Sequence, residues 1–234
     1  MKTNQQGFDI IIPVYNEGKN IIKLIKYLLN SSKNISNIYI CFDFDNDSSV
    51  IAIKNSKYAN NKNIILLKNL HSGPCEAVKT GFYHSKSKVV VMYPADDLNN
   101  GLLLDKMYEY FLNGYDVICP SRFMKGGIMK NCPLLKSILV RIVSFTLYYF
   151  ARIKTKDPTN GFRMFSRKLL NNVSIKSNEG FAYSIELLVK AKHLNLNIIE
   201  VPSIWIERED RKSSFKIIKW SKSYIKWYLL AFFR

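Results

Sequence analysis

Two adjacent carboxylates, Asp96 and Asp97, stand directly after a short apolar run that spans Val89–Met92. The run shows no alternation of polar and apolar residues, which favours a central strand buried on both faces. In open α/β sheets, ligands bind just beyond the carboxyl ends of the strands. Paired carboxylates at such a place suit a hard divalent cation that also carries a phosphate group. Aspartate is equally common in solvated turns and at helix N-termini, so the pair alone leaves both interpretations open.

The first hundred residues contain the elements that would position this pair. Apolar runs favour strands over Phe8–Val14, Ile38–Phe42, Asn63–Leu67 and Val89–Met92. The intervening segments favour helices over Asn20–Leu29, Ser48–Tyr58 and Cys75–His84. Such alternation of strands and helices predicts a parallel sheet covered by helices, with right-handed crossovers.

Acidic residues follow three of these strands. Glu17 lies in the loop after the first strand, Asp43 opens an acidic cluster after the second, and Asp96 follows the fourth. Because the carboxyl ends of parallel strands meet at one edge of a sheet, we expect these carboxylates to converge there. That edge is the predicted binding site.

The second half of the sequence continues this pattern with longer helical segments. Further strands are expected over Asp116–Pro120 and Asn197–Val201, and further helices over Leu102–Asn113, Leu134–Ile153 and Tyr183–His193. No internal repeat or low-complexity linker interrupts the sequence. This indicates one domain over residues 1–212, followed by a specialised C-terminal segment over residues 213–234.

The segment Leu134–Ile153 is unusually apolar and carries one narrow polar stripe. The members of the stripe, spaced by three or four residues, are Ser137, Arg141, Ser144, Tyr148 and Arg152. A helix this apolar is buried or lies against lipid. The stripe then faces a ligand or cavity, or it belongs to a core helix whose arginine side chains extend to water. The pattern favours neither alternative.

Residues 213–234 have the period of an amphipathic helix. Its aromatic face comprises Ile217, Trp220, Tyr224, Trp227 and Tyr228, and its basic face comprises Lys219, Lys222 and Lys226. Aromatic residues opposite lysines are typical of a helix that lies in a membrane interface. The alternative is a helix packed on the sheet with a solvated basic face, and we favour the membrane interface.

The chain is strongly basic, with 35 Lys and Arg against 18 Asp and Glu in 234 residues and a formal charge of +17. Such a surplus favours anionic partners such as nucleotides, nucleic acid or an acidic membrane surface. A hydrophobic content of 47% excludes a disordered chain. The cysteines lack the paired spacing of zinc sites, and the sequence shows neither an apolar leader nor a run of about 18 uncharged apolar residues. These features predict a globular, cytoplasmic protein without a membrane-spanning helix.

Several short motifs occur in an order that is typical of one enzyme family. They are Pro13-Val-Tyr15-Asn-Glu17, Ala-Asp96-Asp97-Leu, Ser121-Arg122-Phe, Asp157 with Asn160-Gly161-Phe-Arg163, Gly180-Phe181 with Glu186, and Glu200-Val-Pro with Arg208 and Ser213-Ser-Phe215. With these motifs the chain resembles, over nearly its whole length, the family 2 glycosyltransferases of the GT-A fold. Within them it is similar to the branch of dolichyl-phosphate mannosyltransferase and its bacterial polyprenyl-phosphate relatives. The resemblance implies an α/β fold of the GT-A (Rossmann-like) type, with a mostly parallel sheet flanked by helices and an amphipathic C-terminal helix.

The resemblance also implies a site for a nucleotide-sugar donor and a divalent cation. The residues that would contact the nucleotide sugar are Pro13, Tyr15, Glu17, Asp43, Asp96 and Arg208. Asp96 and Asp97 occupy the position of the family's metal-binding motif and would hold Mg²⁺ or Mn²⁺ on the diphosphate, with Asp97 as the catalytic carboxylate.

A second group of positions resembles the site for an acceptor phosphate. These positions are Arg122, Arg141 and Ser144, together with Lys212 and Ser213 of a loop that closes over the diphosphate in the family. A phosphate acceptor is already anionic and needs no general base. A hydroxyl acceptor needs a carboxylate within hydrogen-bond reach, for which Asp97, Asp157 and Glu179 are the candidates.

Three functions are compatible with these patterns. The first is an inverting enzyme that moves a hexose from a GDP- or UDP-sugar to a polyprenyl phosphate, bound peripherally at the cytoplasmic face of an anionic membrane. The second is transfer to a hydroxyl group of a glycan or glycolipid in surface polysaccharide assembly. The third is a basic, non-catalytic module that binds membrane or nucleic acid, although the sequence contains no nucleic-acid motif. The polar stripe and the amphipathic tail favour the first.

Overall fold

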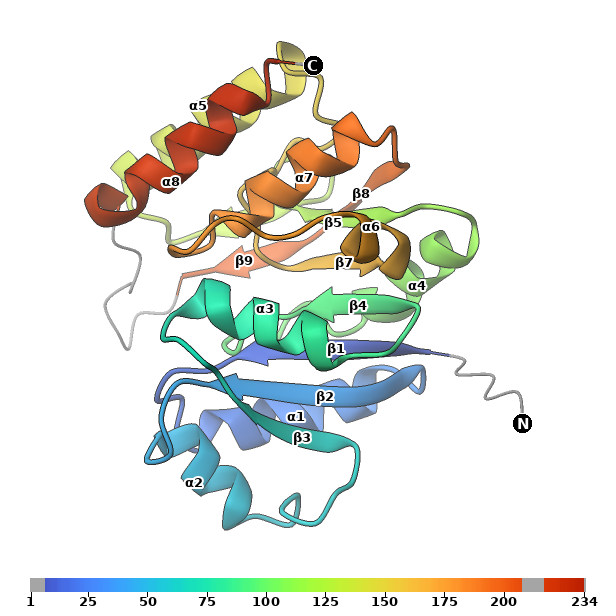
Figure 1. Ribbon diagram of the computed structural model, residues 1–234, viewed down its shortest axis with the longest axis vertical. Coiled ribbons are helices and arrows are strands. Elements are labelled where there is room, and N and C mark those ends of the chain that lie inside the picture. Colours follow the sequence, from blue (N-terminus) through green and yellow to red (C-terminus); the bar gives the residue numbers. More distant parts are fainter. Residues whose placement is uncertain (1–6, 208–216, 234) are drawn as a thin grey trace.

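The computed structural model of the chain describes residues 7–207 and 217–233. Its centre is a seven-stranded sheet with the strand order β3-β2-β1-β4-β7-β5-β8 (Figure 1). These strands are β1 (Phe8–Pro13), β2 (Ile35–Phe42), β3 (Ile64–Lys68), β4 (Val89–Met92), β5 (Val117–Ser121), β7 (Arg163–Ser166) and β8 (Ile198–Pro202). A separate two-stranded sheet joins β6 (Ile128–Lys130) to β9 (Ile204–Ile206).

Helices cover both faces of the large sheet. On one face the core includes residues of α1 (Asn20–Ser31), α2 (Ser48–Lys54) and α4 (Leu103–Leu112). On the other face it includes residues of α3 (Pro74–His84), α5 (Leu134–Tyr149), α6 (Arg167–Asn172), α7 (Tyr183–His193) and α8 (Ile217–Leu230). Every residue of β4 is buried between these layers. The expected α/β fold, with a mostly parallel sheet flanked by helices, is confirmed.

The first four strands run parallel to one another, as the sequence predicts. β1 lies between β2 and β4 and runs parallel to both, and β3 joins the outer side of β2 in the same direction. The carboxyl ends of these strands therefore meet at one edge of the sheet. Because Asp96 and Asp97 follow β4, which pairs directly with β1, they lie beside the loop that follows β1.

β7 is the strand of the large sheet that the sequence patterns do not predict, and they do not predict the short strands β6 and β9 either. It inserts between β4 and β5 and runs antiparallel to both. Its first residue, Arg163, is fully buried, and the guanidinium donates hydrogen bonds to the carbonyl groups of Ser184 and Asp157 at 2.7 and 3.2 Å. A four-residue strand that begins with a buried arginine has no apolar run to reveal it.

Gly81 allows α3 to approach β1 closely. A Cβ atom at this position would lie 2.3 Å from Cγ2 of the fully buried Ile11. We expect Gly81→Ala to destabilise the fold by about 1–3 kcal/mol through overpacking, although alanine is the better helix former by about 1 kcal/mol. Urea unfolding measures this change, with Tyr83→Ala on the exposed side of the same helix as the control. A Gly81→Ala protein as stable as the unchanged one would contradict this close packing.

α5 and α8 lie side by side above the α7 layer, at one end of the molecule (Figure 1). Tyr228 of α8 donates a hydrogen bond to Thr146 of α5 at 3.0 Å, and Trp227 and Ala231 are buried in the core. Among the described side chains of the expected aromatic face, Tyr224, Trp227 and Tyr228 therefore pack against the protein. The side chains that α8 and the residues after it leave exposed are Lys222, Ile225, Lys226, Leu229, Leu230, Phe232 and Phe233.

α5 is not a core helix. Only Ser144 and Leu147 of this helix are buried. Its large apolar side chains that remain exposed are Leu134, Leu135, Ile138, Leu139, Ile142, Phe145 and Tyr149. The helix ends at Tyr149, earlier than predicted, and Arg152 has a positive φ of 55°, so the last member of the expected stripe lies outside the helix.

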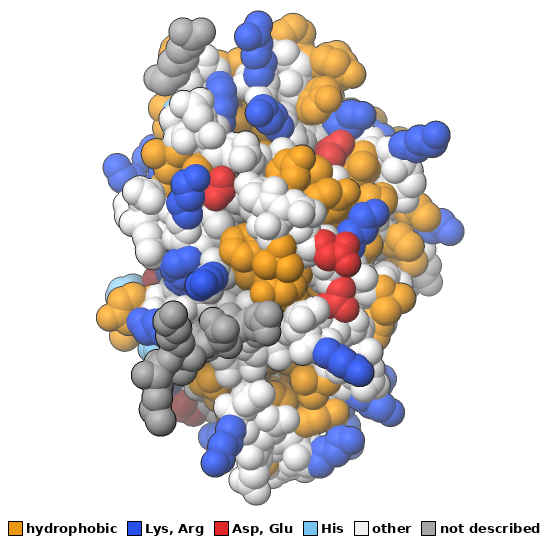
Figure 2. Space-filling view, turned by 90° about the vertical axis from the view of Figure 1, so that its right-hand side faces the viewer, with side chains coloured by type: hydrophobic (Ala, Val, Ile, Leu, Met, Phe, Trp, Pro, Cys, Tyr) orange, Lys and Arg blue, Asp and Glu red, His pale blue; other side chains and the backbone are white. Residues whose placement is uncertain are grey.

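The surface charge is dispersed on the face that Figure 2 shows. Lysine and arginine side chains are scattered over it, and hydrophobic side chains gather near its middle. This face does not carry the continuous basic stripe that a nucleic-acid groove requires. In the part of the chain that the structure describes, no helix is both long and apolar enough to cross a membrane.

Candidate functional site

The loops after β1 and β2 are joined by hydrogen bonds at the predicted edge. The backbone N–H of Asn16 donates to Asp47 Oδ2 at 2.9 Å, and that of Ser48 donates back to Asn16 Oδ1 at 3.1 Å. The N–H of Glu17 donates to Ser49 Oγ at 2.9 Å. The loop that contains Tyr15 and Glu17 is thus fixed on the N-terminal turn of α2.

The predicted nucleotide residues differ in exposure. Pro13 is the last residue of β1, and the Tyr15 side chain is 64% exposed and contacts the ring of Phe44 at a centroid distance of 5.7 Å. Glu17 is buried, whereas Asp43 is half-buried and accepts hydrogen bonds from Asn69 Nδ2 and from the Gly73 N–H at 2.8 and 3.0 Å. The exposed ring of Tyr15 and the hydrogen-bonded carboxylate of Asp43 therefore lie at the same edge of the sheet.

The two aspartates after β4 have different environments. Asp96 is exposed. Asp97 is half-buried: its Oδ1 accepts the N–H groups of Asn99 and Asn100 at 2.8 and 3.1 Å, and its Oδ2 accepts Asn100 Nδ2 at 2.6 Å. Burial raises the pKa of Asp97 above its ordinary value, and the donors of Asn99 and Asn100 oppose that increase. Asp97 therefore shapes the loop, while Asp96 faces the solvent beside it.

The oxygen atoms of this pair fit a divalent cation. Mg²⁺ and similar ions are commonly held by one or two carboxylates together with substrate phosphates and water. Asp96 is exposed at the sheet edge. Both lone pairs of Asp97 Oδ1 accept N–H groups of the loop, whereas Oδ2 accepts one hydrogen bond and retains a second lone pair. Among residues 7–207 and 217–233 there is no cluster of three or more His, Cys, Asp and Glu side chains that would form a metal site by itself.

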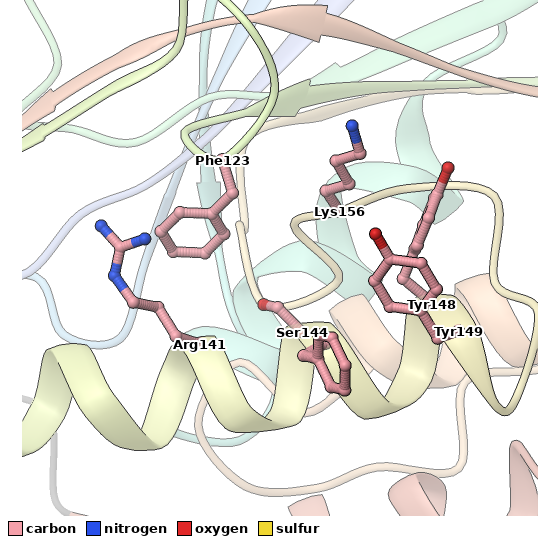
Figure 3. Close-up of a pocket in the computed structure, with 7 residues that line it drawn as sticks. Phe123, Arg141, Ser144, Tyr148, Tyr149 and Lys156 are labelled. Carbon is pink, nitrogen blue, oxygen red and sulfur yellow. The ribbon is translucent and has the colours of Figure 1, made fainter.

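A cavity of about 250 Å³ lies over the polar stripe of α5 (Figure 3). Its lining residues are Phe123, Arg141, Ser144, Phe145, Tyr148, Tyr149 and Lys156. In Figure 3, Arg141, Ser144 and Tyr148 rise from one side of α5, and Phe123 descends towards them from the opposite loop. Three members of the predicted stripe are thus brought together at a cavity.

The cavity contains two cationic side chains and a buried hydroxyl group. Arg141 lies over the ring of Phe123 at 4.9 Å, and Lys156 Nζ lies 5.7 Å from the ring of Tyr148. Neither cation forms an ion pair with a carboxylate of the described residues. The Ser144 hydroxyl is buried without a hydrogen-bond partner from those residues. Two unpaired cations and an unsatisfied hydroxyl at one cavity favour a phosphate group as its ligand.

Arg122 does not belong to this cavity. Its Nε and Nη2 donate to the two oxygens of Asp157 at 2.6 and 2.7 Å, and its backbone N–H donates to the same carboxylate at 2.9 Å. Asp157 is fully buried. This bidentate pair fixes the loop after β5, and its neighbour Phe123 is the residue that reaches the cavity.

Lys156 is a residue of the cavity that the sequence analysis missed. It lies in the loop after α5, where no period or motif singles it out. Its backbone N–H donates to Glu200 Oε2 at 2.7 Å, which places the side chain over Tyr148. Three predicted site residues lie outside the described residues. They are Arg208, expected at the nucleotide sugar, and Lys212 and Ser213, expected in the loop that closes over the diphosphate.

Comparison with known proteins places the chain among glycosyltransferases. The family model described as glycosyl transferase family 2 matches residues 9–174. A dolichol-phosphate mannosyltransferase of Pyrococcus furiosus is 24% identical over 209 residues, which cover 88% of this chain and 58% of that protein. A polyprenol monophosphomannose synthase of Mycolicibacterium smegmatis is 20% identical over 226 residues, covering 90% of this chain and 85% of that protein. The chain thus spans little more than half of the archaeal relative.

Solved structures show the same fold. The glucosyl-3-phosphoglycerate synthase of Mycobacterium tuberculosis, crystallised with Mn²⁺, uridine diphosphate and glucosyl-3-phosphoglycerate, superposes with a TM-score of 0.70 at 15% identity. The alignment covers 97% of this chain and 80% of the mycobacterial chain. At this identity the similarity establishes the fold, and the substrates of the two proteins are a separate question.

Proposed function

The chain belongs to glycosyl transferase family 2, and from this premise we propose that it transfers a hexose from a nucleotide-diphosphate sugar to a polyprenyl phosphate. The observation that carries the proposal is the cavity over α5, where Arg141, Lys156 and the Ser144 hydroxyl face one space. The names of the archaeal and mycobacterial relatives support a polyprenyl-phosphate acceptor.

The donor binds at the carboxyl edge of β1, β2 and β4 in this proposal. Tyr15, Glu17 and Asp43 contact the nucleotide, and Asp96 and Asp97 hold Mg²⁺ or Mn²⁺ at the diphosphate. The bound cation stabilises the negative charge that develops on the leaving nucleoside diphosphate. Asp97 also keeps the loop in shape through Asn99 and Asn100. The mycobacterial structure with Mn²⁺ and uridine diphosphate supports this assignment for the fold.

The acceptor phosphate binds in the cavity over α5. Arg141 and Lys156 neutralise its charge, and the Ser144 hydroxyl donates a hydrogen bond to it. Because the phosphate oxygen is already anionic, it attacks the anomeric carbon without a general base, and a single in-line displacement inverts that carbon. A hydroxyl acceptor is less well supported. Asp157 is held by Arg122, Glu179 accepts a hydrogen bond from Ser223, and Asp97 holds the cation in this proposal.

The apolar side of α5 supports contact with a lipid surface. The helix that lines the cavity also exposes large apolar side chains, and α8 exposes Lys222 and Lys226 beside it. A lipid acceptor reaches the cavity from such a surface without leaving the bilayer. We therefore propose that the protein associates peripherally with the cytoplasmic face of an anionic membrane.

Leu135→Glu tests this membrane contact. Leu135 is 67% exposed on α5. The loss of one leucine that inserts into the lipid is expected to lower partitioning into anionic vesicles about tenfold. Co-sedimentation with phosphatidylglycerol-containing vesicles measures the bound fraction. Leu112→Glu, at a 64% exposed position of α4 on the other face of the sheet, is the matched control. Equal loss of binding in both variants would indicate that charge alone, and not the α5 surface, governs binding.

The activity itself is tested with labelled GDP- and UDP-hexoses, Mn²⁺ and vesicles that contain undecaprenyl phosphate. We expect a labelled lipid product that depends on the phosphate of the acceptor. The same vesicles with unphosphorylated undecaprenol are the control. Transfer to glycan or glycolipid hydroxyl groups with none to the lipid phosphate would overturn the proposed acceptor.

A further inference from the structure

Asn100 links the aspartate loop to a distant part of the chain. Its side chain is only 3% exposed. One N–H of Nδ2 donates to Asp97 Oδ2 at 2.6 Å, and the other donates to the carbonyl of Ile204 in β9 at 2.7 Å. Its Oδ1 accepts the backbone N–H of Ile204 at 2.9 Å. The amide thus binds both backbone groups of one β9 residue while it holds the Asp97 carboxylate.

The chemistry of this arrangement requires an asparagine. Two donors and one acceptor are used at the same time, and all three partners are fixed by the backbone or by the loop. Aspartate would lose both donors and place a second negative charge beside Asp97. Alanine would leave the carbonyl of Ile204 and an oxygen of Asp97 without these partners. The side-chain amide is therefore the element that joins the two segments.

β9 continues the connection towards the acceptor cavity. It pairs in parallel with β6, and the N–H of Glu207 donates to the carbonyl of Lys130 in β6 at 3.1 Å. The Glu207 carboxylate then pairs with Lys136 in the first turn of α5 at 2.9 Å. A chain of direct contacts runs from Asp97 through Asn100 and β9 to the helix that carries Arg141.

We propose that Asn100 is a positioning residue that fixes the Asp97 carboxylate against β9 and thereby couples donor binding to the acceptor side of the enzyme. The inference rests on the proposed function, because it takes the Asp96–Asp97 loop as the place of the metal and the diphosphate. Asn100 does not itself touch the substrates. It acts through the position of Asp97 and through the β6–β9 sheet.

The first test is the affinity for nucleotide and metal. Titration calorimetry with UDP and GDP in the presence of Mn²⁺ compares the unchanged protein with Asn100→Ala and Asn99→Ala. We expect Asn100→Ala to bind the preferred nucleotide at least about tenfold more weakly, because a hydrogen bond to a charged group is lost. Asn99→Ala is the matched control: its side chain is exposed, and its contact with Asp97 is made by the backbone N–H.

The second test separates positioning from a general loss of stability. Amide hydrogen exchange of β9 is measured with and without nucleotide and Mn²⁺, well below the unfolding temperature. We expect the ligands to slow exchange in β9 of the unchanged protein and of Asn99→Ala, and to have no such effect in Asn100→Ala. A residue with a merely structural role would lower the melting temperature but leave the affinity and the ligand-dependent protection unchanged.

The outcomes distinguish the two proposals. If the unchanged protein binds UDP or GDP with Mn²⁺ and Asn100→Ala binds within about twofold of it, the role of Asn100 is overturned and the proposed function stands. If the unchanged protein binds neither nucleotide, the proposed function is overturned together with this inference. If Asn100→Ala does not fold, Asn100→Asp, which keeps the size and the acceptor for Ile204, is expected to show the same loss of affinity.

Discussion

Asp97→Asn is expected to reduce hexose transfer on the order of a hundred- to a thousandfold, with little change in the stability of the protein. The loss follows from the charge: the amide has almost the shape of the carboxylate, but its neutral oxygen is a weaker ligand for a divalent cation and does not balance the charge of that cation. The loss of one electrostatic stabiliser of a transition state costs on the order of 10²–10³ in rate. The measurement is the initial rate of transfer to undecaprenyl phosphate, together with thermal unfolding of each protein.

The fold is expected to survive because the loop can keep its main bonds. The oxygen of an asparagine at position 97 can still accept the backbone N–H groups of Asn99 and Asn100, which now donate at 2.8 and 3.1 Å. Only the hydrogen bond from Asn100 Nδ2 is lost, because an amide nitrogen then replaces Oδ2. Burial already disfavours the charged form of Asp97, so a neutral side chain removes a desolvation cost. Glu109→Gln, the same change at an exposed position of α4, is the control and should leave transfer intact. Full activity in Asp97→Asn would contradict the metal assignment.

The N-terminal half of the molecule, which carries the proposed donor site, is where sequence patterns predict the most. Apolar runs such as Val89–Met92 and the helical segments between them follow the parallel β–α alternation, whose rules fix strand direction and the edge at which loops meet. The position of Asp96 and Asp97 at that edge follows from the same reasoning. These patterns are local, and the strand directions and loop positions that follow from them depend on few long-range contacts.

The features that the sequence did not predict depend on long-range contacts. β7 is held by its neighbours β4 and β5 and by the burial of Arg163, and none of these is visible in four residues. In the sequence, Asn100 resembles an ordinary turn residue. The backbone groups that its side chain binds belong to Ile204, which lies 104 positions away in the sequence. Arg122 matches an acceptor motif, yet the structure pairs it with Asp157. In each case a partner distant in sequence decides what the side chain does.

The polar stripe of α5 was predicted only in part, because it depends on both a local pattern and long-range contacts. Its spacing correctly predicts a shared face for Arg141, Ser144 and Tyr148, because helical period is a local property. Whether that face meets a cavity or the core depends on the loops opposite, and there Phe123 and Lys156 complete the cavity. The apolar remainder of the helix is exposed for the same reason: the loops and α8 cover only part of it.

Arg141→Ala is expected to reduce transfer to a lipid phosphate about a hundredfold and to spare hydrolysis of the nucleotide-sugar donor. The guanidinium lies over Phe123 at 4.9 Å and makes no ion pair with a carboxylate in the described part of the chain, so its donors are available to a phosphate. Two charge-assisted hydrogen bonds to a phosphate are worth enough to account for a change of about that size. Donor hydrolysis should persist because the donor residues lie on the loops after β1, β2 and β4, and Arg141 lies on α5.

Two further variants make this prediction specific. Arg141→Lys keeps the charge but loses the planar fork, so an intermediate rate is expected if the arginine binds a phosphate through two donors. Arg152→Ala removes an exposed arginine just past the end of α5, outside the cavity, and should transfer at the rate of the unchanged protein. Separate assays of lipid product and free sugar give both rates from one reaction. If Arg141→Ala loses donor hydrolysis and transfer equally, Arg141 acts on the donor or on the fold; if it loses neither, the stripe is structural, and the acceptor phosphate binds elsewhere.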